Sequence, residues 1–435
     1  MNMEISTNFK ELEIGFIPKD WDAKKMREIA DFQYGLGEAA QEKGDYVYIR
    51  ITDITSDGFL KRDKLVFIDQ AKVKEDCFLE KGDVLVARTG ASFGKTYFFN
   101  ENFKATYGGF LIKYLFNNKF INNKFFFQFS RSNLYWNQAN NLVNGGAQPQ
   151  FNANVIKNLI VPLPSLAEQS SIVEILSSLD DKIELNRKIN NNLEKIASLL
   201  FKQWFVDFEF PNENGEPYKS SDGKMIDSEL GEIPKGWKIS KIGNELNTIL
   251  GGTPRRNNDD YWGDGNIPWI NSGAINNFPI IESSEFITKK GLDNSATKLM
   301  PVKTVVLPFV ISLGKEIKIS ILGIETSGNQ SVLGVIENER FSAEYIYYWI
   351  EKNKNSIYGW ATGGAQQHIN KQNVDETSIL IPLKDIMDKF RIITVPIFDN
   401  IISNSILNKQ VEKLRNSLLP RLMNGKIRVN KKYEQ

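Results

Sequence analysis

The sequence is poor in the two residues that build most metal and redox sites. Among 435 residues there is one cysteine, Cys77, and one histidine, His368. A single cysteine cannot close an internal disulfide, and such usage is typical of a reducing cytosol. Zinc sites need several Cys or His ligands, so the ordinary kinds are excluded. The net charge of +1 also provides no overall basic field.

Targeting and catalytic signatures are missing as well. The first residues, MNMEISTNFKELE, lack the apolar core of a signal peptide, and no apolar run approaches the roughly 18–20 residues of a membrane span. The patterns HExxH, GxSxG and GxGxxG do not occur, nor does an Asn-Pro-Pro-aromatic tetrapeptide. GASFGKT at 90–96 has one residue too few for a phosphate-binding loop. We therefore expect a cytoplasmic protein that binds without catalysing a reaction.

What the sequence does contain is an internal repeat. EIGFIPKDW at 13–21 matches ELGEIPKGW at 229–237 in six of nine positions. Three further matches follow in the same order: GDVLVARTGASFGK at 82–95 with VKTVVLPFVISLGK at 302–315, NGGAQPQFN at 144–152 with TGGAQQHIN at 362–370, and NLIVPLP at 158–164 with SILIPLK at 378–384. The offsets of 216–220 residues indicate a duplicated chain, and we expect its two halves to be similar domains that bind different targets.

Each half begins with short apolar runs broken by Gly, Asn and Pro, which predict an α+β domain. Each half then ends in a long helix with a coiled-coil stripe. The heptad positions of the first helix, within 166–204, are Ile172, Leu179, Asn186, Leu193 and Leu200. Those of the second helix, 218 residues later, are Phe390, Ile397, Asn404, Val411 and Leu418.

The repeat implies an approximate twofold axis, so we expect the two helices to pair antiparallel and to separate two globular domains. Asn186 and Asn404 interrupt the two apolar stripes at the same point, near the middle of each helix. We expect these two side chains to meet and fix the register of the pair. The alternative is that both asparagines are solvated on a slightly rotated face.

The loops between the apolar runs combine Arg, Lys, Asn, Gln and Thr with glycines and aromatics, as in GGTPRRNNDDYWGDGNIPWINSG at 251–273. Arginine chelates guanine edges and Asn or Gln chelates adenine, while lysine and backbone amides hold phosphates. Each loop alone also fits a solvent-exposed turn, but six such loops favour nucleic acid. Eight basic and two acidic residues between 409 and 435 suit a phosphate backbone, an acidic partner or a solvated tail.

Together these strings resemble the specificity subunit of type I restriction–modification enzymes over nearly the whole chain. The most specific are IPKDW and IPKGW, the GGTP…YWG…IPWI stretch, the two GGAQ loops and PLPSLAEQSSIVEILSSLDDKI at 162–183. The last is similar to the family's central conserved segment. The second copy, PLKDIMDKFRII, departs from it because it lacks Ala-Glu-Gln.

The resemblance implies two target-recognition domains that read the two parts of a bipartite, asymmetric double-stranded DNA site, with the helices setting the spacer. Modification subunits would bring S-adenosylmethionine, and restriction subunits ATP and Mg, so that this chain has no cofactor of its own. The expected boundaries are 1–165 and 212–384 for the recognition domains, 166–211 and 385–426 for the helices, and 427–435 for a basic tail. Residues 1–211 alone should self-pair on a palindromic site.

The residues expected to contact DNA lie in the loops of the two halves. They are Arg88, Thr89, Ser92, Lys95 and Gln148 in the first half, and Thr253, Arg255, Arg256, Ser312, Lys315, Gln366 and His368 in the second. The candidates for docking the modification subunits are Glu168, Gln169, Trp204 and Phe205, at the ends of the first helix. Two alternatives stay open: a fused methyltransferase or nuclease, which the missing motifs disfavour, and a coiled-coil scaffold that binds only proteins.

Overall fold

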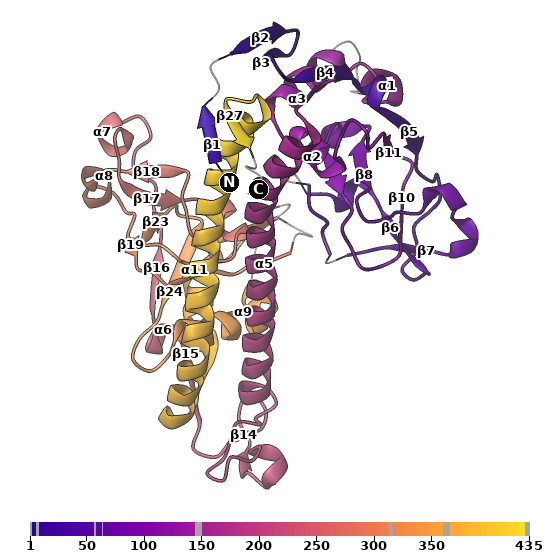
Figure 1. Cartoon of the computed structure of the whole chain (residues 1–435). Helices are drawn as coiled ribbons and strands as arrows, with labels where there is room; N and C mark the ends of the chain where they lie inside the picture. Colours follow the sequence, from indigo (N-terminus) through magenta and orange to yellow (C-terminus); the bar gives the residue numbers. More distant parts are fainter. Residues whose placement is uncertain are drawn as a thin grey trace. The chain divides into compact units, whose positions relative to one another are not determined.

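The computed structural model describes residues 2–5, 8–55, 58–62, 64–143, 150–312, 316–359 and 366–430 (Figure 1). Their contacts divide the chain into two compact units. The first unit comprises Met1–Ile183 and Gln410–Gln435, and the second comprises Glu184–Lys409. The division crosses both long helices, so each unit contains one mixed α/β domain and half of each helix.

The first unit is built on two small sheets. The larger has the antiparallel order β5-β11-β8-β9, formed by Ala30–Tyr34, Leu111–Phe116, Val84–Ala87 and Thr96–Phe98. The smaller has the order β10-β6-β7, formed by Ala105–Tyr107, Tyr46–Ile49 and Phe67–Ile68. The unit also contains two separate two-stranded sheets. They are formed by β2 (Phe9–Leu12) with β3 (Gly15–Pro18) and by β4 (Asp22–Lys25) with β12 (Ile160–Leu163). The short helices are α1 (Met26–Ile29), α2 (Asn123–Phe129), α3 (Asn133–Val143) and α4 (Ala153–Ile156).

The second unit repeats this plan. Its first sheet has the order β16-β24-β20-β22, formed by Asn247–Leu250, Val332–Ile336, Val305–Pro308 and Ser320–Ile321. Its second has the order β18-β17-β23-β19, formed by Glu285–Ile287, Ile267–Ile270, Thr326–Gly328 and Leu299–Met300. The strand pairs are β13 (Met225–Ile226) with β14 (Ile233–Pro234), β15 (Lys238–Lys241) with β26 (Ser378–Ile381), and β21 (Val310–Ser312) with β25 (Gln366–His368). The short helices are α6 (Ile242–Glu245), α7 (Asp259–Trp262), α8 (Lys289–Asp293), α9 (Ala343–Gly359) and α10 (Lys371–Asp375).

The predicted duplication is confirmed by strand order. The four-stranded sheets of the two units match strand for strand, and each second sheet contains one parallel pair, β6 with β10 and β17 with β23. The repeated opening motif has a structural role, because Trp21 and Trp237 are both almost fully buried in the cores of their units. A side chain of that size contributes much of the apolar area that a small domain can bury.

Two helices of 40 residues each follow the recognition domains: α5 (Leu166–Phe205) and α11 (Lys384–Met423). The first ends six residues before the predicted 211. Phe208 adopts a left-handed φ of 61°, and the Glu209 amide donates to the Gln203 carbonyl at 2.8 Å, which closes the helix. The second ends at Met423 and is followed by Gly425, whose φ of 67° lies in the left-handed region that glycine commonly adopts after a helix.

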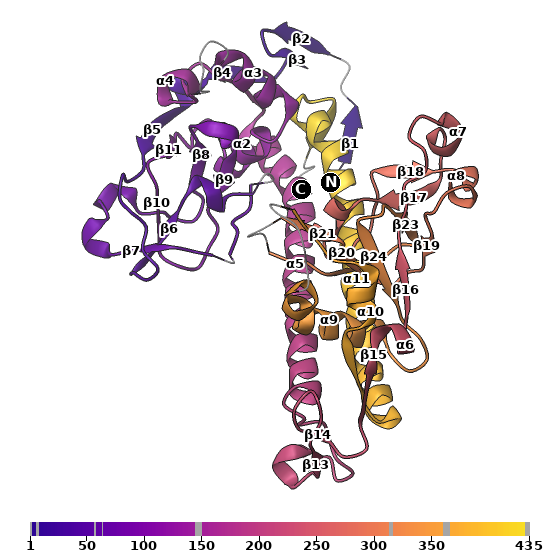
Figure 2. The same ribbon diagram turned by 180° about the vertical axis from the view of Figure 1, so that it is seen from behind.

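The helices run antiparallel within each unit. In the second unit the Asn186 Nδ2 group donates to Asn408 Oδ1 at 2.8 Å, and Asn404 Nδ2 donates to Asn190 Oδ1 at 2.9 Å. Higher numbers on α5 thus meet lower numbers on α11. Helix α9 packs against both, since Tyr348 donates to the Glu194 carbonyl and its ring contacts Phe398 (Figure 2).

The predicted meeting of Asn186 with Asn404 is wrong by one helical turn. The repeat offset of 218 residues makes Asn186 equivalent to Asn404 and Asn190 equivalent to Asn408, so the pairs Asn186–Asn408 and Asn190–Asn404 are equivalent to each other. Each asparagine therefore pairs with a residue one turn away from its own equivalent. Asn190 is further held because its Nδ2 donates to the Ile401 carbonyl and to Ser405 Oγ, both at 3.1 Å.

Replacing Asn190 by leucine is expected to lower the free energy of unfolding by about 1–3 kcal/mol, because Asn404 loses its acceptor inside the helix pair. Urea unfolding measures the change. The double variant Asn190→Leu/Asn404→Leu should recover much of the loss, while Asn191→Leu, at an exposed neighbour, should shift stability by less than about 0.5 kcal/mol. Equal losses in the single and double variants would show that the pair is not coupled.

The expected basic tail at 427–435 is wrong for its first four residues. Ile427–Asn430 forms strand β27, which pairs antiparallel with β1 (Asn2–Ile5) and so joins the two ends of the chain. Arg428 is neutralised: its Nε donates to Glu168 Oε1 at 2.7 Å, and a terminal nitrogen reaches Asp20 at 2.8 Å. Its guanidinium also lies 5.7 Å from the ring centre of Trp21.

One described helix, α11, is long and apolar enough to cross a membrane by length and composition alone. This corrects the expectation that no segment approaches that limit. The same helix carries Thr394 and Asn408 on its buried side and contributes Phe390 and Phe398 to the core of the second unit. Helix packing therefore explains part of its apolar residues, while Ile392 and Ile393 stay exposed.

Candidate nucleic-acid interface

Arg88 is the first residue of the loop that is predicted to contact DNA in the first unit. It follows β8, and its amide donates to the Phe110 carbonyl at 3.0 Å. Its guanidinium lies 5.3 Å from the ring centre of Tyr34 and 5.8 Å from that of Phe110. Thr89 forms a backbone bridge with Gln150, at the exit of the GGAQ loop. The structure thus joins the two predicted DNA segments of this half at their backbones.

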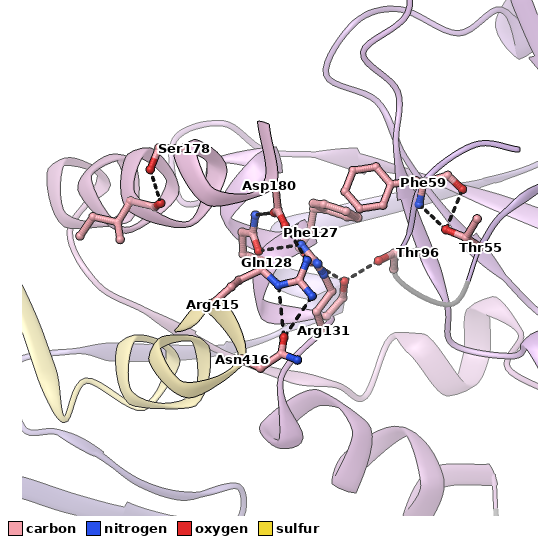
Figure 3. Close-up of polar contacts among 12 residues, drawn as sticks. Thr55, Phe59, Thr96, Phe127, Gln128, Arg131, Ser178, Asp180, Arg415 and Asn416 are labelled. Atoms are coloured by element: carbon pink, nitrogen blue, oxygen red, sulfur yellow. Dashed lines mark hydrogen bonds and ion pairs between the residues drawn. The ribbon is translucent and has the colours of Figure 1, made fainter. Parts of the chain in front are cut away.

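Lys95 lies in a different place. It lines a cavity of about 180 Å³ together with Arg131, Trp136 and Arg415. Both arginines contact Asp180, at 2.7 and 2.8 Å (Figure 3). Burial alone would raise the pKa of Asp180, but the charge and hydrogen bonds of Arg131, with those from Gln128 and Arg415, hold it below its usual value. Ser92 is half-buried in the short turn Gly90–Ser92, so the four loop candidates do not form one patch.

The GGTP loop of the second unit is ordered by aromatic and polar contacts. Thr253 donates to Gln330 Oε1 at 2.6 Å, and the Arg255 carbonyl accepts from Trp262 Nε1 at 3.1 Å. Arg256 stacks on Trp262, at 3.8 Å from the ring centre, and is ion-paired with Glu285. Thr253, Arg255 and Arg256 are all exposed, but the Arg256 guanidinium is already paired with Glu285 of its own domain.

The remaining DNA candidates are described in part. Strand β21 pairs with β25, which sets Ser312 opposite Gln366 and Val310 opposite His368 along the backbone. The structure therefore brings three predicted residues of the second half onto one strand pair; their side chains lie outside the described part. Gln148 and Lys315 lie outside the described residues altogether.

The four docking candidates are buried in this chain, each at most 5% exposed, and their docking role stays a prediction. Glu168 Oε2 accepts from Trp21 Nε1 at 3.1 Å, and Gln169 Oε1 accepts from the Asn122 amide at 2.8 Å. Trp204 and Phe205 pack on Phe390 in the core of the second unit. These side chains hold the chain's own domains to its helices and present no free surface to a second protein.

An exposed apolar stripe on α5 was not predicted from the sequence. Leu185, Ile189, Ile196 and Leu199 are 52%, 39%, 54% and 66% exposed and follow one face of the helix. Ile392, Ile393 and Leu407 are exposed on α11 in the same unit. A heptad pattern cannot distinguish the seam between two helices from a second apolar face of one helix, so it did not predict this stripe.

Both repeated domains carry loops that are rich in polar and aromatic side chains. Among the described residues no three His, Cys, Asp or Glu side chains are grouped to hold a metal ion. The arrangement provides binding surfaces: loop side chains for hydrogen bonds to bases and phosphates, and helical apolar surface for other proteins.

Known proteins share both the sequence and the fold. The chain is 28% identical over 434 residues to the type I restriction enzyme MjaIX specificity subunit of Methanocaldococcus jannaschii, covering 97% of each. It is 27% identical over 336 residues to the HindI specificity subunit of Haemophilus influenzae, covering 65% of this chain and 72% of the relative. The solved S subunit of a type I restriction–modification system from M. genitalium shares the fold, with a TM-score of 0.57, 14% identity and coverage of 93% and 96%.

The family model for the type I restriction modification DNA specificity domain matches twice, at residues 18–195 and 234–414. Each match contains one set of the repeated sheets and reaches into the long helix that follows it. The two matches together cover most of the chain, and the chain therefore belongs to the family of type I restriction modification DNA specificity domains.

Proposed function

We propose that this chain is the DNA-specificity subunit of a type I restriction–modification complex and that each recognition domain reads one part of a bipartite DNA site. The observation that carries the proposal is the duplicated α+β domain, matched twice by the specificity family and followed each time by a 40-residue helix. The family supports DNA specificity over the scaffold alternative and over a fused enzyme. The chain itself is a non-catalytic subunit.

The two recognition domains share a framework but differ in their loops, which favours an asymmetric site. Arg88, directly after β8, corresponds in the repeat to Pro308 at the end of β20. The paired Arg255 and Arg256 of the second unit belong to a loop that differs in the first. Different side chains on equivalent frameworks read different bases. The antiparallel helices of constant length would set the number of base pairs between the two half-sites.

The modification subunits would bind the apolar stripe formed by Leu185, Ile189, Ile196 and Leu199, since a surface of this kind is depleted in charge and able to desolvate. In this proposal S-adenosylmethionine binds in the modification subunits, and ATP and Mg bind in restriction subunits. The complex would act on double-stranded DNA in the cytoplasm.

Lengthening both helices tests the spacer. Four residues inserted after Lys188 and four after Ile406 add about 6 Å at 1.5 Å per residue. These points lie between the two asparagine pairs, so each pair stays intact. Sequencing of modified adenines in a host with the partner subunits should show the same half-sites separated by about two more base pairs, at 3.4 Å per step.

The matched control is a four-residue insertion between 212 and 217, beyond the end of α5, which should leave the spacing unchanged. An unchanged gap after the helix insertions would remove the spacer role. Wild-type complex that binds genomic fragments without sequence preference would contradict the proposed function as a whole and favour the scaffold alternative.

A further inference from the structure

Arg88 borders a cavity of about 640 Å³ in the first unit. Its wall includes Leu36, Tyr48 and Ile51, and Phe110 contributes to its rim. The Tyr48 hydroxyl donates to the Leu36 carbonyl at 2.6 Å and to the Glu38 carbonyl at 3.1 Å, which fixes this wall. The cavity is therefore held open by ordered backbone, as expected of a preformed binding site.

Arg88 differs from five other arginines of the first unit because, among the described residues, no carboxylate compensates its charge. In the first unit Arg50, Arg62, Arg131, Arg415 and Arg428 each contact a carboxylate. In the part of the chain that the structure describes, Arg88 has no such contact, and its buried Nε has no hydrogen-bond acceptor. A buried donor without an acceptor is unfavourable, and among the described residues this one lies beside the cavity that Arg88 lines.

The surroundings of Arg88 orient its guanidinium. The group lies over the rings of Tyr34 and Phe110, at 5.3 and 5.8 Å from their centres. Both rings are substantially exposed, at 43% and 58%. Stacking on aromatic faces keeps the planar fork in one orientation, and the exposed rings supply apolar surface beside it.

We propose that Arg88 reads one guanine of the target through its O6 and N7 atoms, with Phe110 and Tyr34 against the neighbouring base. The two terminal nitrogens of an arginine match that pair of acceptors, and among the described residues no carboxylate competes for those of Arg88. It rests on the proposed function, because it assigns the base class read by the first recognition domain. Since Pro308 occupies the equivalent position, this contact belongs to one half-site only.

The test uses the full chain in complex with its modification subunits, on a duplex whose sequence comes from the modification map. Each guanine of the site is replaced in turn by 7-deazaguanine, which lacks the N7 acceptor. With wild-type protein, one replacement should weaken binding by roughly fivefold to a hundredfold, the range for one bidentate base contact. The Arg88→Met variant should lose a similar factor on the natural duplex and lose nothing further on the modified one.

Two further variants distinguish a loss of base recognition from a loss of folded protein. Arg88→Lys keeps the charge without the fork and should still lose discrimination at the same guanine. Arg62→Met, at an exposed arginine of the same unit paired with Glu101, should leave the affinity pattern unchanged. Thermal unfolding of each complex checks that the variants are folded.

Three results would overturn the proposal. One is a site without guanine in either half, and another is a 7-deazaguanine series that affects wild type and Arg88→Met alike. The third is an even loss of affinity across all sequences with a shallower salt dependence, which would assign Arg88 to a backbone phosphate. In each case selective binding by the wild type would persist, so the proposed function would stand while this inference failed.

Discussion

Replacing Asp180 by asparagine is expected to lower the free energy of unfolding of the first unit by about 3–5 kcal/mol, because it leaves two buried arginines without their counter-charge. Asp180 on α5 receives Arg131 from the segment between α2 and α3 and Arg415 from α11 (Figure 3). Gln128 completes the network by donating to Asp180 at 2.8 Å. One side chain thus ties the recognition domain to both helices within the unit.

Differential scanning calorimetry of the full chain measures this loss as a lower transition temperature for one unit. The matched control is Asp293→Asn, which breaks the exposed Lys289–Asp293 pair and should cost less than about 0.5 kcal/mol. A change at Asp180 no larger than the control would show that the buried network adds nothing to stability.

The same network has a pH dependence of known sign. Because the folded-state pKa of Asp180 is lowered, the unfolded chain binds its proton first as pH falls. The contribution of Asp180 is therefore complete above about pH 5 and is lost below about pH 4, the unfolded value, as pH falls through the lowered pKa. The Asp180→Asn variant should lack this part of the acid sensitivity.

Placing charge on the α5 stripe is expected to abolish assembly with the modification subunit at that surface. Ile196 and Leu199 are the most exposed members of the stripe, and at an interface core each would contribute about 2 kcal/mol. The double variant Ile196→Glu/Leu199→Glu should therefore weaken binding by about a thousandfold, more if the charges are buried. Co-purification followed by isothermal titration measures the loss.

The control for this experiment lies on the same helix. Ser198 is exposed but faces away from the stripe, since successive residues of a helix are about 100° apart. Ser198→Glu adds the same kind of charge and should leave assembly intact. Normal assembly of the double variant would show that the stripe is not the docking surface.

The sequence predicted the features that depend on local pattern. The IPKDW and IPKGW repeats predicted two similar domains, and the heptads predicted two long helices, because burial in a helix imposes a period that can be read directly. The structure confirms both. The predicted register of the two helices is wrong by one turn. A heptad pattern determines which face of a helix is apolar, but not which turn of one helix lies against which turn of the other.

The contacts that hold each domain to its helices could not be predicted in the same way. Asp180 and Arg415 are 235 positions apart, and Glu168 and Arg428 are 260 apart, so no local spacing links them. Glu168 and Trp204 looked like surface residues because they stand at the ends of a helix. Folding buries them under segments that the linear order places far away. Side chains that read bases are the hardest to predict from the sequence, because they lie in loops and loop sequences have little periodicity.

The two ends of the helix pair are chemically unlike. In the first unit Asp180 meets Arg415 and Glu168 meets Arg428, whereas the symmetry-related positions in the second unit are Phe398 with Ala197 and Ile386 with Phe210. A homodimer of residues 1–211 would therefore place Asp180 opposite Ala197 and Glu168 opposite Phe210, so that each acid loses the arginine that the carboxyl-terminal part of the chain provides. This loss disfavours pairing between two such copies, contrary to the expectation that residues 1–211 self-pair, and favours the helix pair of the intact chain.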